Sequence, residues 1–376
     1  MVKWKTCTLG DLGAVIGGAT PSTKKPENYD GGEIPWLTPK DLSGFPYRYI
    51  ARGGRNITEQ GLKSCSARLL PKGTVLFTSR APIGYVAIAE NELCTNQGFK
   101  SVIPNENTDS LFLYYLLKCN EAEIERMGSG TTFKEVSGSV MRSVQVRVPE
   151  DIRYQRRISG LLGLLDDKIE LNTRMNANLE RQAGAIYADM FITRAGALWK
   201  RGRLSDLVRV RYGKDHKKLA DGKIPVYGSG GLMRYAERAL YARESVLIPR
   251  KGTLNNVMYV SEPFWTVDTM FYTEILRPNA AKFAYHFLRR KNLAAMNAGS
   301  AVPSMTADIL NAMELRIPDD ERLADFEETV SPMYRAMSAN EKQSGALITM
   351  RDALLPRLMS GELDASKLPL AGEGIP

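Results

Sequence analysis

The spacing of hydrophobic positions predicts two long helices, one after Pro149 and one after Pro318. Beyond each proline, hydrophobic residues recur at intervals of three and four, and an acidic pair opens each stretch (Glu150-Asp151 and Asp319-Asp320). Acidic side chains stabilise the first turn of a helix because they face its exposed amide groups. Each pattern is long enough for a helix of about 40 residues, or about 60 Å.

The two predicted helices carry the same hydrophobic register. Asn172 in the first helix and Glu341 in the second place a polar residue at corresponding positions of the seam, which would fix the alignment of a coiled coil. The seam positions that we expect to pair the helices or to bind a partner are Leu161, Leu165, Met175, Leu179, Ile186, Val330, Tyr334, Met337, Ile348 and Leu355. The alternative is that each helix packs only on its own domain, but the shared register favours pairing.

The segments before each helix alternate hydrophobic and polar residues over short runs, which is typical of strands. The predicted strands cover residues 74–79, 83–89, 144–148, 245–249, 256–260, 270–276 and 313–317. The predicted shorter helices cover residues 110–118 and 282–293, and Asn56 is expected to cap another that ends near Ser64. These segments predict two globular modules of mixed α/β fold.

The two modules are diverged copies of one another. Residues 130–149 (GTTFKEVSGSVMRSVQVRVP) and 299–318 (GSAVPSMTADILNAMELRIP) share a small hydroxyl residue after glycine and an alternating strand closed by proline. Earlier in each copy, a strand-like segment precedes Arg80 in one and Arg250 in the other, at a slightly different offset, so loops differ in length. The predicted domains are module 1 (1–149), a first long helix (150–196), module 2 (197–318), a second long helix (319–363) and a flexible tail (364–376).

The net charge of +9 is unevenly distributed along the 376 residues. Module 1 carries 18 basic and 14 acidic residues and module 2 carries 20 and 10, whereas the first long helix carries 7 of each and the remainder 6 basic and 11 acidic. Two basic modules on less basic connectors suggest two contacts with a polyanion such as double-stranded DNA. The alternative is a basic surface without a partner.

Composition argues against several classes of protein. Hydrophobic residues make up 43% and charged residues 25%, which is ordinary for a globular protein. No run reaches the ~18 uncharged apolar residues of a membrane helix, and the first residues lack the apolar core of an export signal. The four cysteines lie far apart without a CxxC pair, so we expect no disulfide framework or zinc site, and a cytoplasmic location.

The sequence contains none of the common catalytic patterns. There is no Walker A loop, GxGxxG, HExxH or Asn-Pro-Pro-Tyr motif. Of the two histidines, His216 lies in a basic loop and His286 is expected to pack within a helix. The neighbouring Asp166 and Asp167 should point to different faces of a helix, so they do not form an acid–base pair. The chain is therefore predicted to bind rather than to catalyse, with no cofactor or metal of its own.

Basic, hydroxyl and amide residues gather in glycine- or proline-bounded loops of both modules. Small hydroxyl groups and backbone amides hold phosphates, whereas Arg, Lys, Asn and Gln can read base edges. The candidate DNA-binding residues are Thr20, Ser22, Lys24, Lys40, Ser79, Arg80, Gln97, Thr131, Thr132, Lys134, Lys214, Ser229, Arg250, Lys251, Asn255 and Ser300. Any one of these loops alone is more typical of an ordinary turn, and it is their recurrence in two basic modules that favours contact with DNA.

Several segments resemble the specificity (S) subunits of type I DNA restriction–modification systems. They are LGDLGAVIGGATPS (9–22), IPWLTPKDL (34–42), LPKGTVLFTSRAPIGYVAIAENELCTNQGFKS (70–101), SGTTFKEVS (129–137), LLGLLDDKIELNTRMNANLE (161–180) and MRDALLPRLMSGEL (350–363). The resemblance covers nearly the whole chain, and the segment 70–101 is the most specific. Module 2 departs from module 1 in its loops, with Arg-Lys-Gly-Thr at 250–253 in place of Arg-Ala-Pro-Ile at 80–83.

The resemblance implies an architecture and a set of partners. The modules would be target-recognition domains in tandem repeat, separated by two long helices that form an antiparallel coiled coil. Each would read half of a split DNA target, for a restriction system that defends against phage. Two methyltransferase (M) subunits would grip the helices and restriction translocase (R) subunits would complete the complex, so S-adenosylmethionine, ATP and Mg would act on those partners.

Two other interpretations of the sequence stay open. One is a DNA-modifying enzyme whose motifs have diverged beyond recognition. The other is a recognition module of another defence complex, or a stand-alone DNA-binding regulator.

Overall fold

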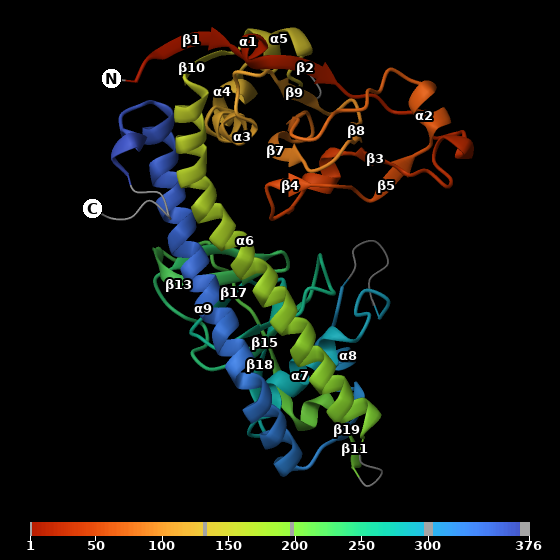
Figure 1. The fold of residues 1–376 in the computed structure, drawn as a ribbon. Coiled ribbons are helices and arrows are strands. Elements are labelled where there is room, and N and C mark those ends of the chain that lie inside the picture. The colour runs from red at the N-terminus through yellow and green to blue at the C-terminus, as the bar shows by residue number, and fades with distance from the viewer. Residues whose placement is uncertain (1, 131–133, 196–198, 297–303, 369–376) are drawn as a thin grey trace. The chain divides into compact units, whose positions relative to one another are not determined.

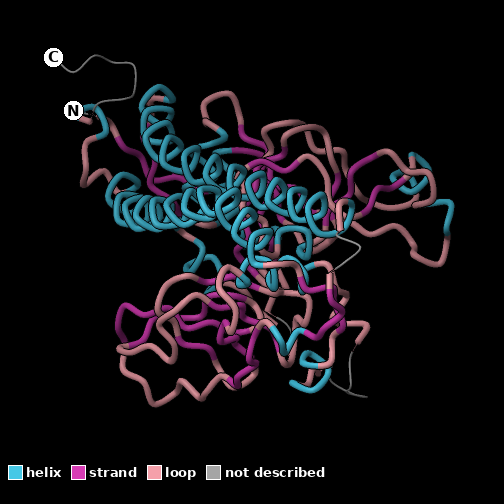
Figure 2. Tube along the Cα trace, turned by 90° about the horizontal axis from the view of Figure 1, so that it is seen from below, coloured by secondary structure: helices cyan, strands magenta, loops and turns pink. Residues whose placement is uncertain are grey.

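The computed structural model describes residues 2–130, 134–195, 199–296 and 304–368 of the chain (Figure 1). The chain forms two compact units, and each takes one module together with one end of each long helix. Unit 1 comprises Met1–Arg174 and Asn340–Pro376, and unit 2 comprises Met175–Ala339. The fold is mixed α/β, as the sequence predicts, with two modules in tandem. Figure 2 shows that the strands belong to the modules, whereas the two long segments are helical.

Module 1 in unit 1 is built on a five-stranded sheet with the strand order β2-β9-β6-β7-β4. These strands are β2 (Gly13–Gly17), β4 (Tyr49–Ile50), β6 (Val75–Ser79), β7 (Ile83–Ala89) and β9 (Lys100–Pro104). A second sheet joins β5 (Arg55–Ile57), β3 (Ile34–Leu37) and β8 (Cys94–Thr95), and β1 (Trp4–Thr8) pairs with β10 (Gln145–Pro149). The helices are α1 (Leu9–Leu12), α2 (Glu59–Lys63), α3 (Ser110–Cys119), α4 (Glu121–Arg126) and α5 (Gly138–Ser143).

Module 2 in unit 2 repeats this plan with fewer strands. Its larger sheet has the order β12-β18-β15-β16, and its smaller sheet has the order β14-β13-β17. The strands are β11 (Lys200–Arg203), β12 (Val208–Tyr212), β13 (Asp221–Gly228), β14 (Gly231–Ala236), β15 (Ser245–Pro249), β16 (Met258–Val260), β17 (Trp265–Thr266), β18 (Met270–Ile275) and β19 (Glu314–Ile317). The helices are α7 (Ala280–Arg289) and α8 (Ala307–Asn311). Strand β11 pairs with β19 as β1 pairs with β10.

The long helices are α6 (Ile152–Ala188), followed by a π-helical turn (Asp189–Thr193), and α9 (Asp320–Met359). They run antiparallel within each unit. In unit 1 the Asn172 amide donates to Ser344 Oγ at 3.1 Å, and in unit 2 the Asn176 amide donates to the Met337 carbonyl at 3.1 Å. Later residues of α6 therefore meet earlier residues of α9, which confirms the predicted coiled-coil arrangement.

The buried face of α6 differs in part from the predicted seam. Leu162 and Tyr187 are buried, whereas Leu161 and Ile186, one position earlier, are only partly buried. Adjacent helical residues point about 100° apart, so the helix is rotated relative to a simple two-helix seam. The physical reason is that α6 also covers the core of a module and must bury a wider face than a two-helix seam provides.

The other seam positions divide between the core and the surface. Val330 and Met337 are buried in unit 2. Leu165, Leu179, Tyr334 and Leu355 are half-buried. Met175 and Ile348 are exposed, at 42% and 38%, so neither side chain is part of the buried pairing surface.

Two further expectations require correction. Thr58, not Asn56, caps helix α2, because its hydroxyl accepts from the Gly61 amide at 3.0 Å. Residues 364–368, predicted as part of a flexible tail, pack against helix α6 within unit 1. Tyr154 donates to the Asp364 carboxylate at 2.9 Å, and Arg157 donates to the Ala365 carbonyl at 2.8 Å. These groups on α6 bind one side chain and one backbone carbonyl of the segment that follows α9, which the hydrophobic pattern could not reveal.

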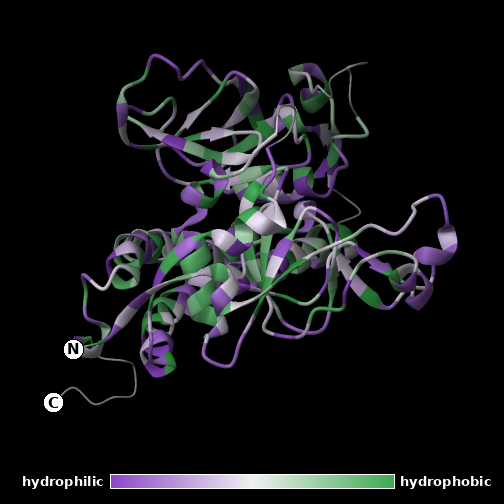
Figure 3. Ribbon diagram, turned by 90° about the horizontal axis from the view of Figure 1, so that it is seen from above, coloured by the Kyte–Doolittle hydropathy of each residue, from purple (hydrophilic) through white to green (hydrophobic). Residues whose placement is uncertain are grey.

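The hydrophobic cores lie under the sheets and against the long helices. In unit 1 the helix α3 is buried along most of its length and packs with Ile158 and Leu162 of α6. In unit 2 the rings of Tyr187, Phe283 and Phe326 form one aromatic cluster. Figure 3 shows hydrophilic and hydrophobic residues alternating along the helices, and many hydrophilic residues along the peripheral loops. Within the described part of the chain, no helix is both long and apolar enough to cross a membrane.

Candidate nucleic-acid interface

The loop that follows the central strand is held in the same way in both modules. The Ser79 amide donates to the Gly98 carbonyl at 2.7 Å, and the Arg250 amide donates to the Thr269 carbonyl at 2.8 Å. The carbonyls of the same two residues accept from later amides, Val136 at 3.0 Å and Met305 at 2.9 Å. These bonds make Ser79 the structural counterpart of Arg250. The sequence comparison, which matched Arg80 with Arg250, is wrong by one residue, and the counterpart of Arg80 is Lys251.

A second loop, which follows β2 in module 1 and β12 in module 2, is also held in the same way in both modules. In module 1 the Ala19 amide donates to the Thr95 carbonyl at 3.0 Å, and in module 2 the Lys214 amide donates to the Thr266 carbonyl at 2.9 Å. The preceding residues are Gly18 and Gly213. A Cβ on Gly18 would lie 2.1 Å from a backbone oxygen, and one on Gly213 would lie 2.0 Å from another. Only glycine permits these two backbone segments to lie so close together.

A buried tryptophan completes the support in each module. The indole of Trp36 donates to the Ala19 carbonyl at 3.0 Å, and the indole of Trp265 donates to the Lys214 carbonyl at 2.9 Å. We call the backbone bonds of Ser79 and Ala19 in module 1, and those of their counterparts Arg250 and Lys214 in module 2, the loop frame. The loop frame fixes where the neighbouring side chains begin, and the residue types then decide what they can bind.

The loop frame of module 1 holds a cluster of charges. Arg80 Nη1 lies 3.5 Å from Glu135 Oε2, and Lys100 Nζ lies 3.1 Å from Glu135 Oε1. The Lys100 ammonium also donates to Ser79 Oγ at 3.4 Å. Thr20 donates to the side-chain oxygen of Gln97. The structure therefore brings Thr20 together with Gln97. It also brings Arg80 together with Lys100 and Glu135, which the sequence analysis did not select.

The remaining candidates of module 1 differ in accessibility. Ser22, Lys24, Lys40, Gln97 and Lys134 are exposed, and Thr20 and Arg80 are half-buried. Ser79 is fully buried and donates to the Gly98 carbonyl at 3.2 Å, so its hydroxyl supports the loop and cannot reach DNA. Thr131 and Thr132 lie outside the described residues. The signal for Glu135 was its place beside Lys134 in a loop of otherwise small and basic residues.

Module 2 presents its cations differently. The Arg250 guanidinium lies over the Tyr212 ring, 5.4 Å from its centroid, and donates weakly to the Asp268 carbonyl at 3.5 Å. Lys214 and Lys251 are exposed. Tyr212 is 54% exposed and was not among the candidates, although a ring that supports an arginine is a common partner in nucleic-acid binding.

Two other candidates of module 2 hold loops in place. Asn255 accepts from the Ala294 amide at 2.9 Å and donates to the Asn292 side chain at 3.3 Å, so its amide group is engaged. The Ser229 carbonyl accepts from Asn256 at 2.9 Å, which ties the hairpin of β13 and β14 to the loop after Arg250. Ser300 lies outside the described residues.

In unit 1 a buried arginine ties module 1 to helix α6. Arg48 has a side chain only 6% exposed, and it pairs with Glu170 at 2.9 Å and with Asp167. Burial opposes its charge, but the hydrogen bond to Glu170 raises the pKa of Arg48 above its ordinary value. Asp166, on a different face of the helix, accepts from the Tyr115 hydroxyl at 2.6 Å and from Arg351 of α9 at 2.7 Å.

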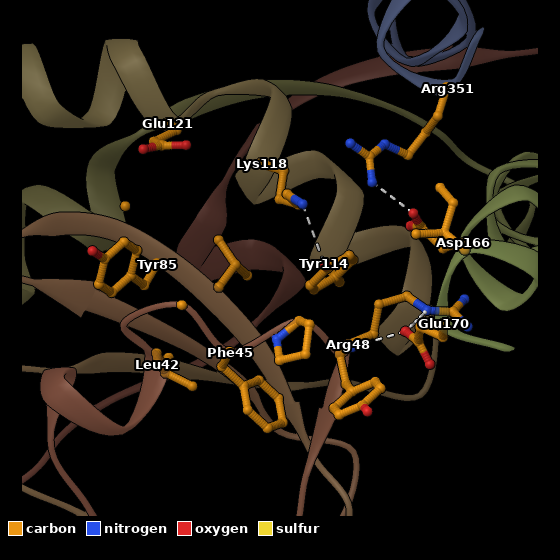
Figure 4. A pocket seen from close by; sticks show the side chains of 16 residues that line it. Leu42, Phe45, Arg48, Tyr85, Tyr114, Lys118, Glu121, Asp166, Glu170 and Arg351 are labelled. Carbon is orange, nitrogen blue, oxygen red and sulfur yellow. Dashed lines mark hydrogen bonds and ion pairs between the residues drawn. The ribbon is translucent and has the colours of Figure 1, made fainter. Parts of the chain in front are cut away.

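These ion pairs border a cavity of about 380 Å³ in unit 1 (Figure 4). Lys118 lines it and donates to the Tyr114 hydroxyl at 3.3 Å. Burial and then the charge of Arg351 lower the pKa of Lys118. The cavity lies where module 1, α6 and α9 meet within unit 1, so it belongs to the attachment of the module to the helices.

In unit 2 the attachment uses a buried lysine and a neutral histidine. Lys282 is 5% exposed and lies 2.5 Å from the Glu327 carboxylate. His286 shares a hydrogen bond of 2.8 Å with the Tyr334 hydroxyl through Nε2. Burial, reinforced by Arg289 and Arg290, lowers the pKa of His286 to about 4. His286 therefore packs within its helix, as expected, and its low pKa favours the neutral form.

Comparisons with known proteins agree on one family. The family model for the type I restriction modification DNA specificity domain matches residues 1–181 and 197–342. The type I restriction enzyme MjaIX specificity subunit of Methanocaldococcus jannaschii is 33% identical, over 97% of this chain and 94% of its own length. The EcoR124I/EcoR124II specificity subunit of Escherichia coli is 30% identical over 44% of this chain and 41% of its own.

A solved structure shares the fold. The crystal structure of the type I restriction–modification system S subunit from M. genitalium matches with a TM-score of 0.59 at 17% identity. The match covers 95% of this chain and 96% of that one. At this identity the similarity concerns the fold alone.

Proposed function

Because the chain belongs to the type I restriction modification DNA specificity domain family, we propose that it is the sequence-reading subunit of such a system. Each module reads one half of a bipartite DNA target, and the helices α6 and α9 connect the two modules. The observation that carries this proposal is the loop frame. It occurs once in each module, and basic side chains surround it both times.

The candidate DNA contacts are the accessible residues around each loop frame. Positively charged side chains there would neutralise phosphates, while the fixed loops would bring selected side chains to base edges. In module 1 these are Thr20, Ser22, Lys24, Lys40, Arg80, Gln97 and Lys134. In module 2 they are Lys214, Arg250 and Lys251. The modules correspond to the proposed domains 1–149 and 197–318.

The exposed apolar residues of the long helices are the proposed contacts with methyltransferase subunits. In unit 1, Leu164 and Leu171 on α6 are 42% and 50% exposed, and Ile348 and Met350 on α9 are 38% and 53% exposed. Leu164 and Leu171 are one heptad apart, so they lie on one face of α6. Large exposed apolar side chains at this spacing are typical of a surface that a partner protein covers.

The chain is proposed to act without catalysis of its own, in the cytoplasm. Methyl transfer and cleavage would belong to the M and R subunits, with S-adenosylmethionine, ATP and Mg bound there. The sequence carries none of the motifs that such chemistry uses.

Selection from random double-stranded DNA tests the proposal. The purified chain, alone and with the M subunits of its own system, is incubated with the DNA, and the bound fraction is sequenced and tested for methylation. We expect two short sequence elements separated by an unread spacer, with methylation only when M subunits are present. Binding without a bipartite element would support a stand-alone regulator, and methylation by the chain alone would support a diverged enzyme.

A further inference from the structure

The charge cluster of module 1 contains an acidic residue at the place where DNA is proposed to bind. We infer that Glu135 is a specificity-determining residue, which orients Arg80 to read a guanine and disfavours phosphate at the same place. The inference rests on the proposed function and adds to it a role for Glu135 and the base that Arg80 reads. Its basis is the geometry of Arg80, Lys100 and Glu135.

The ion pair leaves much of the Arg80 guanidinium available. Arg80 Nη1 is 3.5 Å from Glu135 Oε2, and the arginine side chain is 34% exposed. A guanidinium has five N–H donors in a planar fork, so a carboxylate at one end orients the plane and leaves other donors free. An arginine presented in this way can donate two bonds to O6 and N7 of guanine, the commonest specific contact in the major groove.

The charge of Glu135 makes the site around Arg80 favour a base edge over a phosphate. Its carboxylate is 38% exposed and is shared between Arg80 and Lys100, which lies at 3.1 Å. A phosphate that approached Arg80 would meet the negative charge of Glu135, whereas the guanine edge offers neutral acceptors. Like charges brought together cost free energy, so Glu135 lowers the affinity of this site for the DNA backbone more than for the base.

Module 2 lacks the equivalent carboxylate. Val136 and Met305 occupy the same place in the loop frame, so Ser304 is the counterpart of Glu135. Ser304 forms a β-bridge with Lys251, which is the counterpart of Arg80. In the described part of the chain, neither Arg250 nor Lys251 has a carboxylate within ion-pair distance. Lys251 is therefore expected to contact phosphate, and module 2 supplies a control for module 1.

The test compares four variants of the full chain: Arg80→Ala, Glu135→Gln, Glu135→Asp and Lys251→Ala. Each is selected against random DNA, and its affinity for non-specific DNA is measured at several salt concentrations. Arg80→Ala should lose a guanine preference of roughly 5- to 150-fold at one position of one half-site, with the other half-site unchanged. Lys251→Ala should weaken binding to all sequences alike.

Glu135→Gln tests the carboxylate itself. It should bind non-specific DNA more tightly than the parent, and the slope of log affinity against log salt should steepen by about 0.9 for each additional phosphate that the variant neutralises. Glu135→Asp keeps the charge and should keep the parent's slope. Thermal unfolding of each variant shows whether the fold is retained.

Three outcomes would overturn the inference. They are a base other than guanine at the position that depends on Arg80, uniform weakening by Arg80→Ala, and an unchanged salt slope in folded Glu135→Gln. The installation of a carboxylate by Ser304→Glu gives an independent check, since it should reduce non-specific binding by module 2. A parent chain that selected no bipartite element would instead contradict the proposed function, and that result is visible before any variant is compared.

Discussion

The two modules share a backbone and differ in the side chains placed on it. At matched positions, module 1 has Gly17 and Lys100 on β2 and β9, and module 2 has Tyr212 and Phe271 on β12 and β18. Lys100 donates to the buried Ser79, whereas in module 2 a cation, Arg250, occupies the Ser79 position itself. A positive charge therefore lies beside each loop frame, but it comes from the first residue of β9 in module 1 and from the residue after β15 in module 2.

This difference explains how one fold can read unlike sequences. The bonds that hold the loops use backbone atoms, two glycines and two tryptophans, so they place few demands on the residues that face outward. Those residues can then change without loss of the loop geometry. The comparison predicts that substitutions in the loop frame disrupt a module, whereas substitutions around it alter only what the module binds.

The largest effects are expected where a buried cation ties a module to the helices. Arg48→Ala in unit 1 and Lys282→Ala in unit 2 each remove the cation that pairs with a poorly solvated carboxylate, Glu170 or Glu327. Each should destabilise its own unit by about 3–5 kcal/mol. Chemical unfolding followed by fluorescence and by limited proteolysis measures the loss and identifies the unit. The double variant Lys282→Met/Glu327→Leu should recover much of the stability, and equal losses in single and double variants would contradict this account.

Glycine in the loop frame is the next most sensitive feature. Gly18→Ala and Gly213→Ala would each force a methyl group against backbone oxygens, at a cost of about 3 kcal/mol. Gly345→Ala is a matched control, because nothing lies within 4 Å of its Cβ position on α9. That control should stabilise the helix by about 0.5–1 kcal/mol. Urea midpoints compare the three variants, and similar midpoints for all three would show that the close approach is not required.

Acid should destabilise unit 2 through its buried histidine. His286 has a pKa of about 4 when folded, and an exposed histidine has one near 6.5, so the unfolded chain takes up the proton first as the pH falls. Stability from the neutral histidine is complete above about pH 6.5 and declines towards pH 4, with a loss of about 2 kcal/mol by pH 5. Both histidines of the chain lie in unit 2, so unit 1 has no such loss from histidine.

The measurement is the urea midpoint of each unit between pH 7 and pH 5. The variant His286→Phe removes the titrating group while it keeps a ring at this site, and it should flatten the pH dependence of unit 2 in this range. A parent chain that showed the same dependence in both units would argue that carboxylates, rather than His286, dominate.

A smaller effect is expected in the middle of the helix pair. Asn172 is 1% exposed and its amide donates to Gln343 at 3.0 Å and to Ser344 at 3.1 Å. Asn172→Ala removes these bonds, and because Gln343 is exposed and can turn to water, the loss should be about 1 kcal/mol. Thermal unfolding of unit 1 measures it, with Leu171→Ala on the exposed face as the control that should leave stability nearly unchanged.

The sequence predicts the long helices well because two signals agree there. Pro149 and Pro318 end strands, and the hydrophobic register after each repeats along the chain. The rotation of α6 was not predictable, since a helix that packs on both a module and a partner helix buries a wider face than either alone.

The candidate site was harder to predict than the fold. A serine in a strand gives no sign of whether its hydroxyl faces solvent or a carbonyl, so Ser79 was misjudged. The shift of one residue between Arg80 and Lys251 is visible only in the backbone hydrogen bonds of the loop frame. Glu135 was not among the candidates because only basic, hydroxyl and amide residues were expected to contact DNA. An acidic residue that orients an arginine falls outside those types.

The central claim is that each module reads its own half-site through the residues around its loop frame. The most direct test is the DNA selection profile of two variants, Lys134→Ala in module 1 and Arg250→Ala in module 2, beside that of the parent chain. The Lys134 side chain is exposed, and the Arg250 side chain lies over the exposed Tyr212 ring. Arg250 makes its loop-frame bonds through backbone atoms, which alanine keeps. The account predicts that each variant changes recognition in one half-site, a different one for each, and leaves the other half-site as in the parent. A change in both half-sites from either single substitution would contradict it.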